Sequence, residues 1–238
     1  MSVPFSRAVA ESSRVRFVDT FHDLVTTRFA DGVNALCWQR TLEGDFNEVV
    51  QHLTAGGNLA TVNEVSLRHL ALSDRGKAAV EILIEDQQRL QQLGLAPVLD
   101  WIRQYPRDED GGPVRTDVYS FHADSATVET DTYLCSYTGA ASEGVSNEEV
   151  LRCIDDPVTR AELLKACGGD DDAEFLEYLK VNCYDLHYIP LPSARPFSFG
   201  LGNLWRIAVD YPGSPVPPCV HRAPNTSPGD PPRLLLIS

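Results

Sequence analysis

The sequence lacks any apolar run of the roughly 18 residues that a membrane span requires. Its first residues, MSVPFSRAVAESS, also lack the apolar stretch of a signal peptide. Basic residues are scarce, with 20 Lys and Arg against 34 Asp and Glu, which gives a net charge of −14. Nucleic acids and anionic membrane surfaces are bound by basic patches. We therefore expect a cytoplasmic protein that binds neither nucleic acid nor a membrane.

The six cysteines are widely spaced, with no two closer than 14 positions, so the sequence has no CxxC pair. Structural zinc sites usually take ligands two to four residues apart, and disulfide frameworks are typical of small secreted chains. Most of the cysteines are therefore expected to be reduced and buried. The sequence also lacks a glycine-rich phosphate-binding fingerprint, a GxSxG nucleophile elbow and an HExxH helix, so it does not favour nucleotide binding or hydrolysis.

A chain of 238 residues is long enough to bury a sizeable core in one domain. Apolar residues at helical spacing run from Asn47 to Leu93, and a helical insertion is expected at about 147–180. Short segments rich in β-branched and aromatic residues predict strands at Val114–Phe121, Thr130–Tyr137, Tyr184–Leu191, Leu204–Val209, Val216–His221 and Arg233–Ile237. We expect a single α+β domain, with a mainly helical flank that includes some strands at 1–113 and an antiparallel β core at 114–238.

Histidine occurs six times, and only His122 is followed by a carboxylate two positions later, at Asp124. Alternate residues of an extended chain point to the same side, so a strand end would direct both side chains toward one point. His221 closes a later predicted strand, and Arg233 opens the last strand twelve positions downstream. Two histidines and one carboxylate form the facial triad of non-haem Fe(II) sites, which leaves three coordination positions open. A neighbouring arginine can bind a carboxylate of a cosubstrate in a bidentate pair.

The order of strand, HxD, long insertion, His, about a dozen residues, Arg and terminal strand resembles that of the Fe(II)/2-oxoglutarate-dependent oxygenases, from about Arg115 to Ser238. This resemblance implies a double-stranded β-helix (jelly-roll) core, with Fe(II) bound by His122, Asp124 and His221 and with 2-oxoglutarate and O₂ as cosubstrates. The segments FHADSATVETDTYLCSYTG, CVHRAP, PRLLLIS and VNALCWQR also resemble a bacterial family catalogued as domain of unknown function 1826. The name of that family implies no substrate.

Five more residues are candidates for the site. Tyr133 and Tyr137 share one face of a predicted strand, where they could donate a hydrogen bond to the cosubstrate or belong to the core. Strand alternation turns Arg222 away from the metal, so it could bind a substrate carboxylate or hold the proline-rich turn. Arg115 is a strand-borne cation that could also bind substrate. His187 is an alternative third ligand or a core histidine.

The leading interpretation is an Fe(II)- and 2-oxoglutarate-dependent oxygenase that activates a C–H bond of a small, amino-acid-derived substrate in secondary metabolism. Within this class, the chain also resembles the oxygenases that close a nitrocyclopropane ring on a nitroalkyl amino acid. Two alternatives stay open, a cupin-like dioxygenase that needs no cosubstrate and a non-catalytic metal- or ligand-binding protein. The apolar helix face from Val80 to Leu90 is expected to be core or the contact surface of a homodimer.

Overall fold

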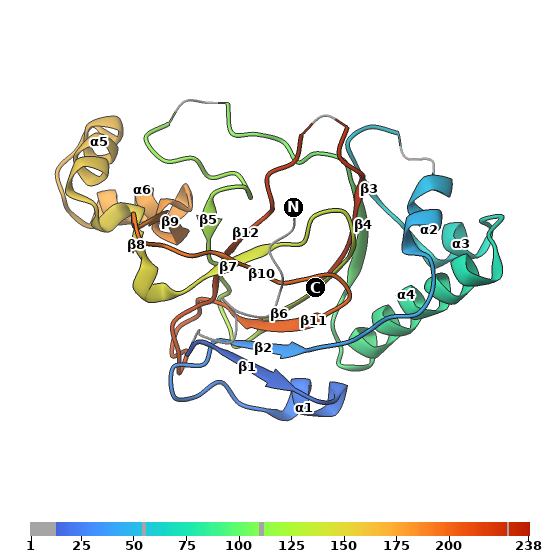
Figure 1. The fold of residues 1–238 in the computed structure, drawn as a ribbon. Coiled ribbons are helices and arrows are strands. Elements are labelled where there is room, and N and C mark those ends of the chain that lie inside the picture. The colour runs from blue at the N-terminus through green and yellow to red at the C-terminus, as the bar shows by residue number, and fades with distance from the viewer. Residues whose placement is uncertain (1–12, 54–55, 110–111, 228) are drawn as a thin grey trace.

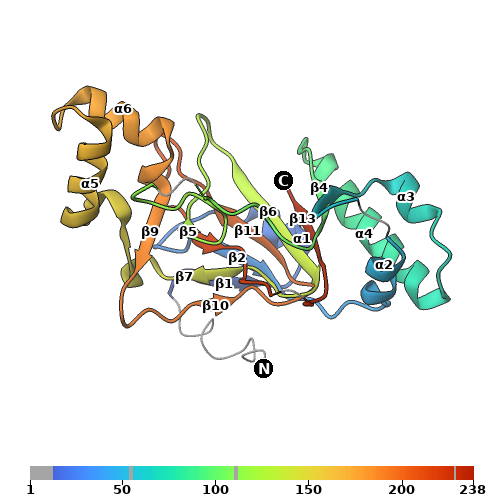
Figure 2. The ribbon, with the colours of Figure 1, turned by 90° about the horizontal axis from the view of Figure 1, so that it is seen from above.

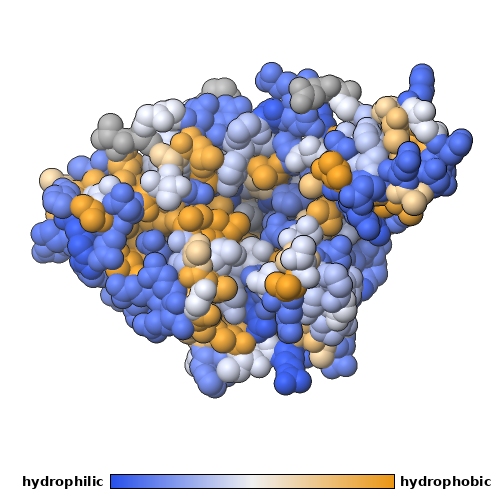
Figure 3. Space-filling view, turned by 180° about the vertical axis from the view of Figure 1, so that it is seen from behind, coloured by the Kyte–Doolittle hydropathy of each residue, from blue (hydrophilic) through white to orange (hydrophobic). Residues whose placement is uncertain are grey.

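The computed structural model describes residues 13–53, 56–109, 112–227 and 229–238. The chain forms a mixed α/β structure in which two β-sheets lie between two groups of helices (Figures 1 and 2). Within the described residues, no helix combines the length and the apolar composition needed to cross a membrane. The face seen from behind is largely hydrophilic at its edges, and hydrophobic residues gather toward its middle (Figure 3).

The larger sheet has seven strands, and all neighbouring pairs except β1 and β2 are antiparallel. In spatial order they are β1 (Val15–Val18), β2 (Ala35–Trp38), β11 (Leu204–Ala208), β6 (Asp131–Thr138), β13 (Arg233–Ile237), β4 (Val98–Ile102) and β3 (Leu59–Thr61). Four of the seven come from before residue 113. The first part of the chain therefore contributes directly to the β core and is more than the mainly helical flank that we expected.

The smaller sheet is antiparallel and has six short strands. In spatial order they are β10 (Phe197–Ser198), β7 (Glu143–Val145), β12 (Val220–Arg222), β5 (Phe121–His122), β9 (His187–Pro190) and β8 (Val150–Arg152). Phe197 of β10 belongs to the same buried cluster as Leu134, Trp205 and Leu235 of the larger sheet. The two sheets therefore share a core.

Three predicted strands coincide closely with β6, β11 and β13, but the strand predicted at Val114–Phe121 is wrong, since only its last residue belongs to β5. The Asp117 carboxylate accepts hydrogen bonds from the backbone N–H groups of Tyr119 and Asp108, which folds this segment into turns. The strand predicted at Val216–His221 begins only at Val220, because two prolines precede it closely and cannot donate to a sheet.

The helices at one end are α2 (Phe46–His52), α3 (Glu64–Arg68) and α4 (Asp74–Gln92), whereas α1 (Phe21–Thr26) lies beside β1 and β2 (Figure 1). Strand β3 interrupts the segment expected to be helical from Asn47 to Leu93. Val80, Leu83, Ile84 and Leu90 of α4 are buried in the largest core cluster, so this apolar face is core and is not available as a dimer surface.

The other helices form the insertion expected at about 147–180, at the opposite end of the molecule (Figure 1). It opens with β8 between two short 3₁₀ helices, η1 (Asn147–Glu149) and η2 (Cys153–Asp155), and continues as α5 (Pro157–Cys167) and α6 (Ala173–Val181). A third 3₁₀ helix, η3 (Tyr184–Leu186), then leads into β9. Asp156 caps α5 by accepting a hydrogen bond from the Thr159 N–H, and Gly168 ends it at a φ of 78°.

A buried ion pair joins α4 to the larger sheet. Two guanidinium nitrogens of Arg40 each lie 2.8 Å from a carboxylate oxygen of Asp86, and the Tyr137 hydroxyl donates to the same carboxylate at 2.7 Å. Asp86 is almost fully buried. Removal of one partner would leave the other charge buried and unpaired. The resulting loss of free energy of unfolding exceeds the net stabilisation that the intact pair provides.

We predict that Asp86→Ala lowers the free energy of unfolding by about 3–5 kcal/mol, because the Arg40 guanidinium then loses its buried carboxylate. Urea unfolding followed by circular dichroism measures this loss. Asp74→Ala, at a fully exposed position of the same helix, is the matched control and should leave the free energy of unfolding nearly unchanged. Equal effects of the two substitutions would contradict the prediction.

Candidate metal centre

The smaller sheet brings three histidines into one row. His122 of β5 lies directly opposite His221 of β12 on one side and His187 of β9 on the other. Directly opposed residues of antiparallel strands point to the same face of a sheet. The ring centroid of His122 is 4.6 Å from that of His221 and 5.7 Å from that of His187. Strands that are distant in the sequence therefore place these imidazoles side by side.

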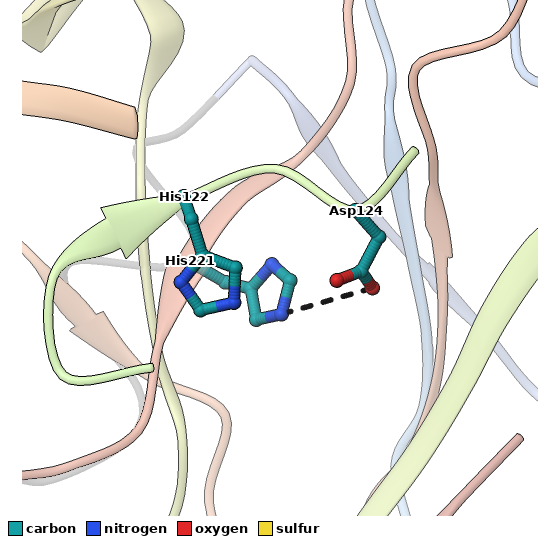
Figure 4. Close-up of side chains that lie close together, drawn as sticks. All are labelled: His122, Asp124 and His221. Carbon is teal, nitrogen blue, oxygen red and sulfur yellow. Dashed lines mark ion pairs between the residues drawn. The ribbon is translucent and has the colours of Figure 1, made fainter. Parts of the chain in front are cut away.

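Asp124 completes a cluster with two of these histidines. It follows β5, and its carboxylate points toward His221, with 3.9 Å between Oδ2 and the imidazole Nε2 (Figure 4). One possible ligand atom of each of His122, Asp124 and His221 lies within 4.8 Å of the others. Three donors on one face of an ion, each at about 2.0–2.2 Å from it, lie about 3 Å apart. Binding of a metal ion would therefore draw the three side chains closer together than the 4.8 Å that bounds their present separations.

Backbone carbonyl groups set the tautomers of both candidate histidine ligands. Nδ1 of His122 lies 2.8 Å from the Ser120 carbonyl oxygen, and Nδ1 of His221 lies 3.3 Å from that of Cys219. A carbonyl oxygen can only accept, so each Nδ1–H donates and each Nε2 keeps its lone pair for a metal. The Asp124 carboxylate is oriented in a similar way, by a 2.6 Å hydrogen bond from the Thr132 hydroxyl.

The surroundings also favour the protonation states that a metal requires. Burial, together with the neighbouring His221, lowers the pKa of His122 to about 4, so its imidazole is neutral at neutral pH. Burial alone would raise the pKa of Asp124, but the nearby His221 and the Thr132 hydrogen bond outweigh it, and the pKa lies below its usual value. A neutral imidazole and an ionised carboxylate are therefore ready to coordinate a cation without releasing protons.

Arg233 is a buried cation whose hydrogen-bond partners are neutral groups. Its side chain is 1% exposed. Nε donates to the Ala140 carbonyl oxygen at 2.7 Å, and Nη2 contacts the hydroxyl groups of Ser142 at 3.0 Å and Ser136 at 3.5 Å. No carboxylate among the described residues pairs with it, and burial lowers its pKa. Such a guanidinium is suited to an anionic ligand.

Arg233 faces the same interior as the histidines. Along β13, Arg233, Leu235 and Ile237 alternate onto one face, and the latter two pack in the cluster shared by the two sheets. Phe199 belongs to that cluster, and its ring centroid lies 6.5 Å from that of His221. Arg233 and the candidate histidine ligands therefore lie on the faces of the two sheets that pack against each other.

The two tyrosine candidates lie on the wrong side of the larger sheet. Tyr133 and Tyr137 belong to the cluster packed against the helices, whereas Leu134, which lies between them on β6, belongs to the cluster between the sheets. The Tyr137 hydroxyl is already bonded to Asp86. The prediction that either tyrosine contacts a cosubstrate beside the metal centre is therefore wrong, because their face of β6 supports the helical layer.

The arginine candidates for substrate binding differ from each other. The Arg222 guanidinium forms an ion pair with Glu143 at 2.7 Å and lies 4.3 Å from the centre of the Phe121 ring, so it holds β12 against its neighbours. Arg115 is exposed, lies in a loop and not on the strand that we predicted, and lines a pocket that also includes Arg222 and His187. Ser136 and Ser142 also contact Arg233, and they were not predicted because nothing in the sequence connects these small residues with it.

The chain was compared with protein-family models, with curated proteins and with solved structures, and none of the three comparisons finds a match. The function of the site must therefore be inferred from its own residues and geometry.

We predict that Asp124→Ala weakens the binding of Fe(II) or Co(II) by more than about 100-fold, because it removes the only carboxylate of the cluster. Titration calorimetry under anaerobic conditions measures the affinity. His52→Ala removes an exposed histidine from α2 and should not change the metal affinity. Equal metal affinity of wild type and Asp124→Ala would show that the cluster is not the binding site.

The depressed pKa of His122 predicts how the stability of the metal-free protein depends on pH. The pKa rises from about 4 in the folded state to 6.5 on unfolding, so the unfolded state binds more protons between these values. The free energy of unfolding should therefore fall as the pH is lowered from about 6.5 to 4. Urea titrations across this range should show that the free energy of unfolding depends less on pH in His122→Phe than in His52→Phe. Identical pH dependence in the two variants would refute the depressed pKa of His122.

Proposed function

We propose that this protein is a cytoplasmic Fe(II)- and 2-oxoglutarate-dependent oxygenase that activates a C–H bond of a small, amino-acid-derived substrate of secondary metabolism. One observation carries the proposal. A donor set of two histidines and one carboxylate lies at the smaller sheet, and a buried guanidinium with no carboxylate partner among the described residues lies on the larger sheet that packs against it. In this proposal the two sheets form the double-stranded β-helix core of such enzymes.

The donor set supports Fe(II) as the ion. Imidazole nitrogens and a carboxylate oxygen are the ligands of the facial triad, in which one face of the ion stays free for other molecules. His122 and His221 come from neighbouring strands and Asp124 from the loop after one of them, so all three approach from the smaller sheet. The opposite side, toward the larger sheet, would remain available for ligands.

The surroundings of Arg233 support a dicarboxylate cosubstrate. A buried charge is costly unless an opposite charge compensates it, and the hydroxyl and carbonyl partners of Arg233 supply none. One carboxylate of 2-oxoglutarate would pair with the guanidinium, while the 2-oxo acid end reaches toward the metal ligands. A dioxygenase without a cosubstrate would have no use for this cation, so the observation favours the leading interpretation over the cupin-like alternative.

When bound, Fe(II) and 2-oxoglutarate would supply the oxygen activation that amino-acid side chains cannot perform. The residues of the chain would then have three tasks. His122, Asp124 and His221 hold the ion through their oriented donor atoms. Arg233 fixes the far end of the cosubstrate, and apolar residues such as Phe199 exclude water from the space between them. Cyclopropane ring closure on a nitroalkyl amino acid is one outcome that we propose for such a site.

We predict that anaerobic Fe(II)-loaded protein develops a visible charge-transfer band when 2-oxoglutarate is added, and that Asp124→Ala abolishes it. Arg233→Gln should raise the 2-oxoglutarate concentration at half-maximal absorbance by about 100-fold, because charge-assisted hydrogen bonds are lost. Absence of the band in the wild type would contradict the proposed function.

Tyr137→Phe is the control for this titration. It removes a hydroxyl from the opposite face of the larger sheet, so it should leave the affinity for 2-oxoglutarate unchanged. Circular dichroism verifies that each variant is folded, and Arg233→Lys tests whether a cation alone restores part of the affinity. A folded Arg233→Gln variant with wild-type affinity would favour the cosubstrate-independent dioxygenase.

A further inference from the structure

Strand β3 lies at one end of the larger sheet, next to β4 (Figure 1). Among the described residues it pairs with β4 alone. The N–H of Val62, directly after β3, donates to the Leu99 carbonyl oxygen of β4. Successive residues of a strand direct their backbone groups to opposite edges. The N–H and C=O groups of Leu59 and Thr61 therefore point away from β4, to an edge where no described strand lies.

The edge of β3 lacks the residues that usually prevent pairing with another chain. Charged side chains and prolines are common protections of edge strands. At the other sheet ends, β1 contains Arg16, β8 contains Arg152 and β10 directly follows Pro196. The sequence of β3 is Leu-Ala-Thr, with no charge and no proline. Leu59 is 43% exposed and Thr61 is also exposed, so this edge is open to a further strand.

The segment around β3 is also free of charge. From Gly56 to Asn63 the sequence is GGNLATVN, although the whole chain has a net charge of −14. Two copies of such an acidic chain repel each other, and the repulsion is smallest where the facing segments are uncharged. A basic partner, in contrast, would find no acidic side chain within this segment. The edge therefore suits an uncharged strand, which a second copy of the chain itself presents.

We propose that β3 is a homodimer contact, in which it pairs antiparallel with β3 of a second copy about a two-fold axis at Ala60. This register places Leu59 opposite the partner's Thr61, and Thr61 opposite the partner's Leu59. Each of these pairs exchanges two backbone hydrogen bonds, so all outward groups of the strand find partners. On the axis, the two Ala60 residues form a close pair with Cα atoms about 4.5 Å apart, which their small side chains permit.

The same register meets open space beyond the strand. It places Asn63 opposite the partner's Gly57, and Glu64, the first residue of α3, opposite the partner's Gly56. Both glycines are exposed, and a Cβ atom added to either would meet no atom within 4 Å. The start of α3 therefore faces positions without side chains. No two charged residues are directly opposed from Gly56 to Glu64.

Sedimentation velocity of the full chain over a range of protein concentrations tests for a dimer. Leu59→Asp should raise the dissociation constant of the dimer at least about tenfold, because the two new carboxylates lie diagonally across the axis and repel each other. Leu176→Asp is the matched control. It makes the same change at a residue of α6 that is 48% exposed at the opposite end of the molecule, and it should leave the dissociation constant unchanged. Circular dichroism verifies that both variants are folded.

Disulfide cross-linking tests the register. Cys183, the exposed native cysteine, is first replaced by serine. In this background, Ala60→Cys should give a covalent dimer under mild oxidation, because its two copies face each other on the axis. Leu59→Cys alone and Thr61→Cys alone should give none, since diagonal Cα atoms lie more than about 7 Å apart. An equal mixture of these two variants should give the covalent dimer, because the two positions are directly opposed.

Added salt gives a further check. It screens the repulsion between two acidic chains, so the dimer should become more stable as the NaCl concentration is raised. A monomer at every concentration, with no covalent dimer of Ala60→Cys, would overturn the proposal. Equal effects of Leu59→Asp and Leu176→Asp would show that the copies meet through another surface. A covalent dimer of Thr61→Cys alone would contradict the proposed axis.

Discussion

The register of the two-residue strand β5 between β12 and β9 is the constraint on which the candidate site depends. A shift by one residue would turn His122 to the opposite face, where Phe121 now packs with Val145 and Val220. This apolar contact fixes which face the histidine occupies. The position of Asp124, directly after the strand, is fixed by the backbone, because the Asp210 N–H donates to the Asp124 carbonyl oxygen. A hydrophobic cluster and a backbone hydrogen bond thus position the candidate ligands His122 and Asp124, neither of which belongs to that cluster.

The two faces of the larger sheet carry different side chains, because successive residues of a strand point to opposite faces. On β6, one face carries Tyr133 and Tyr137 toward the helices, where the buried Asp86 joins the layers. The other face carries Leu134 and Ser136 toward the space between the sheets. The helical layer gives the sheet a rigid support on one side. The inner side can therefore keep polar groups, such as Arg233, that contribute little to packing.

Local sequence patterns predicted the helices and strands whose formation depends mainly on neighbouring residues. The regular apolar spacing of α4, the capping residues of α5 and the alternation in β6 are visible in the sequence and agree with the structure. The pair His122 and Asp124 was found for the same reason, since two residues of extended chain must point the same way. The face of β6 that meets the helices was not predictable, because Tyr and Cys on one face and Leu and Ser on the other suit either side. The turns from Val114 to Ser120 were missed because they depend on the Asp117 carboxylate, whose bonding to backbone N–H groups competes with strand pairing.

Two arginines of similar appearance in the sequence differ in how the fold compensates their charge. Arg222 follows the candidate ligand His221 and forms an ion pair with Glu143, so its charge is satisfied within the protein. Arg233 begins the last strand and is buried among neutral groups, a condition that lowers stability unless something else compensates the charge. Local violations of the rules that stabilise a fold are expected at sites that bind ligands. Among the described residues only three buried side-chain polar atoms lack a partner, and one of them is Nδ1 of His187, next to the same histidine row. The uncompensated charge of Arg233 would be explained if an anionic ligand completed its surroundings.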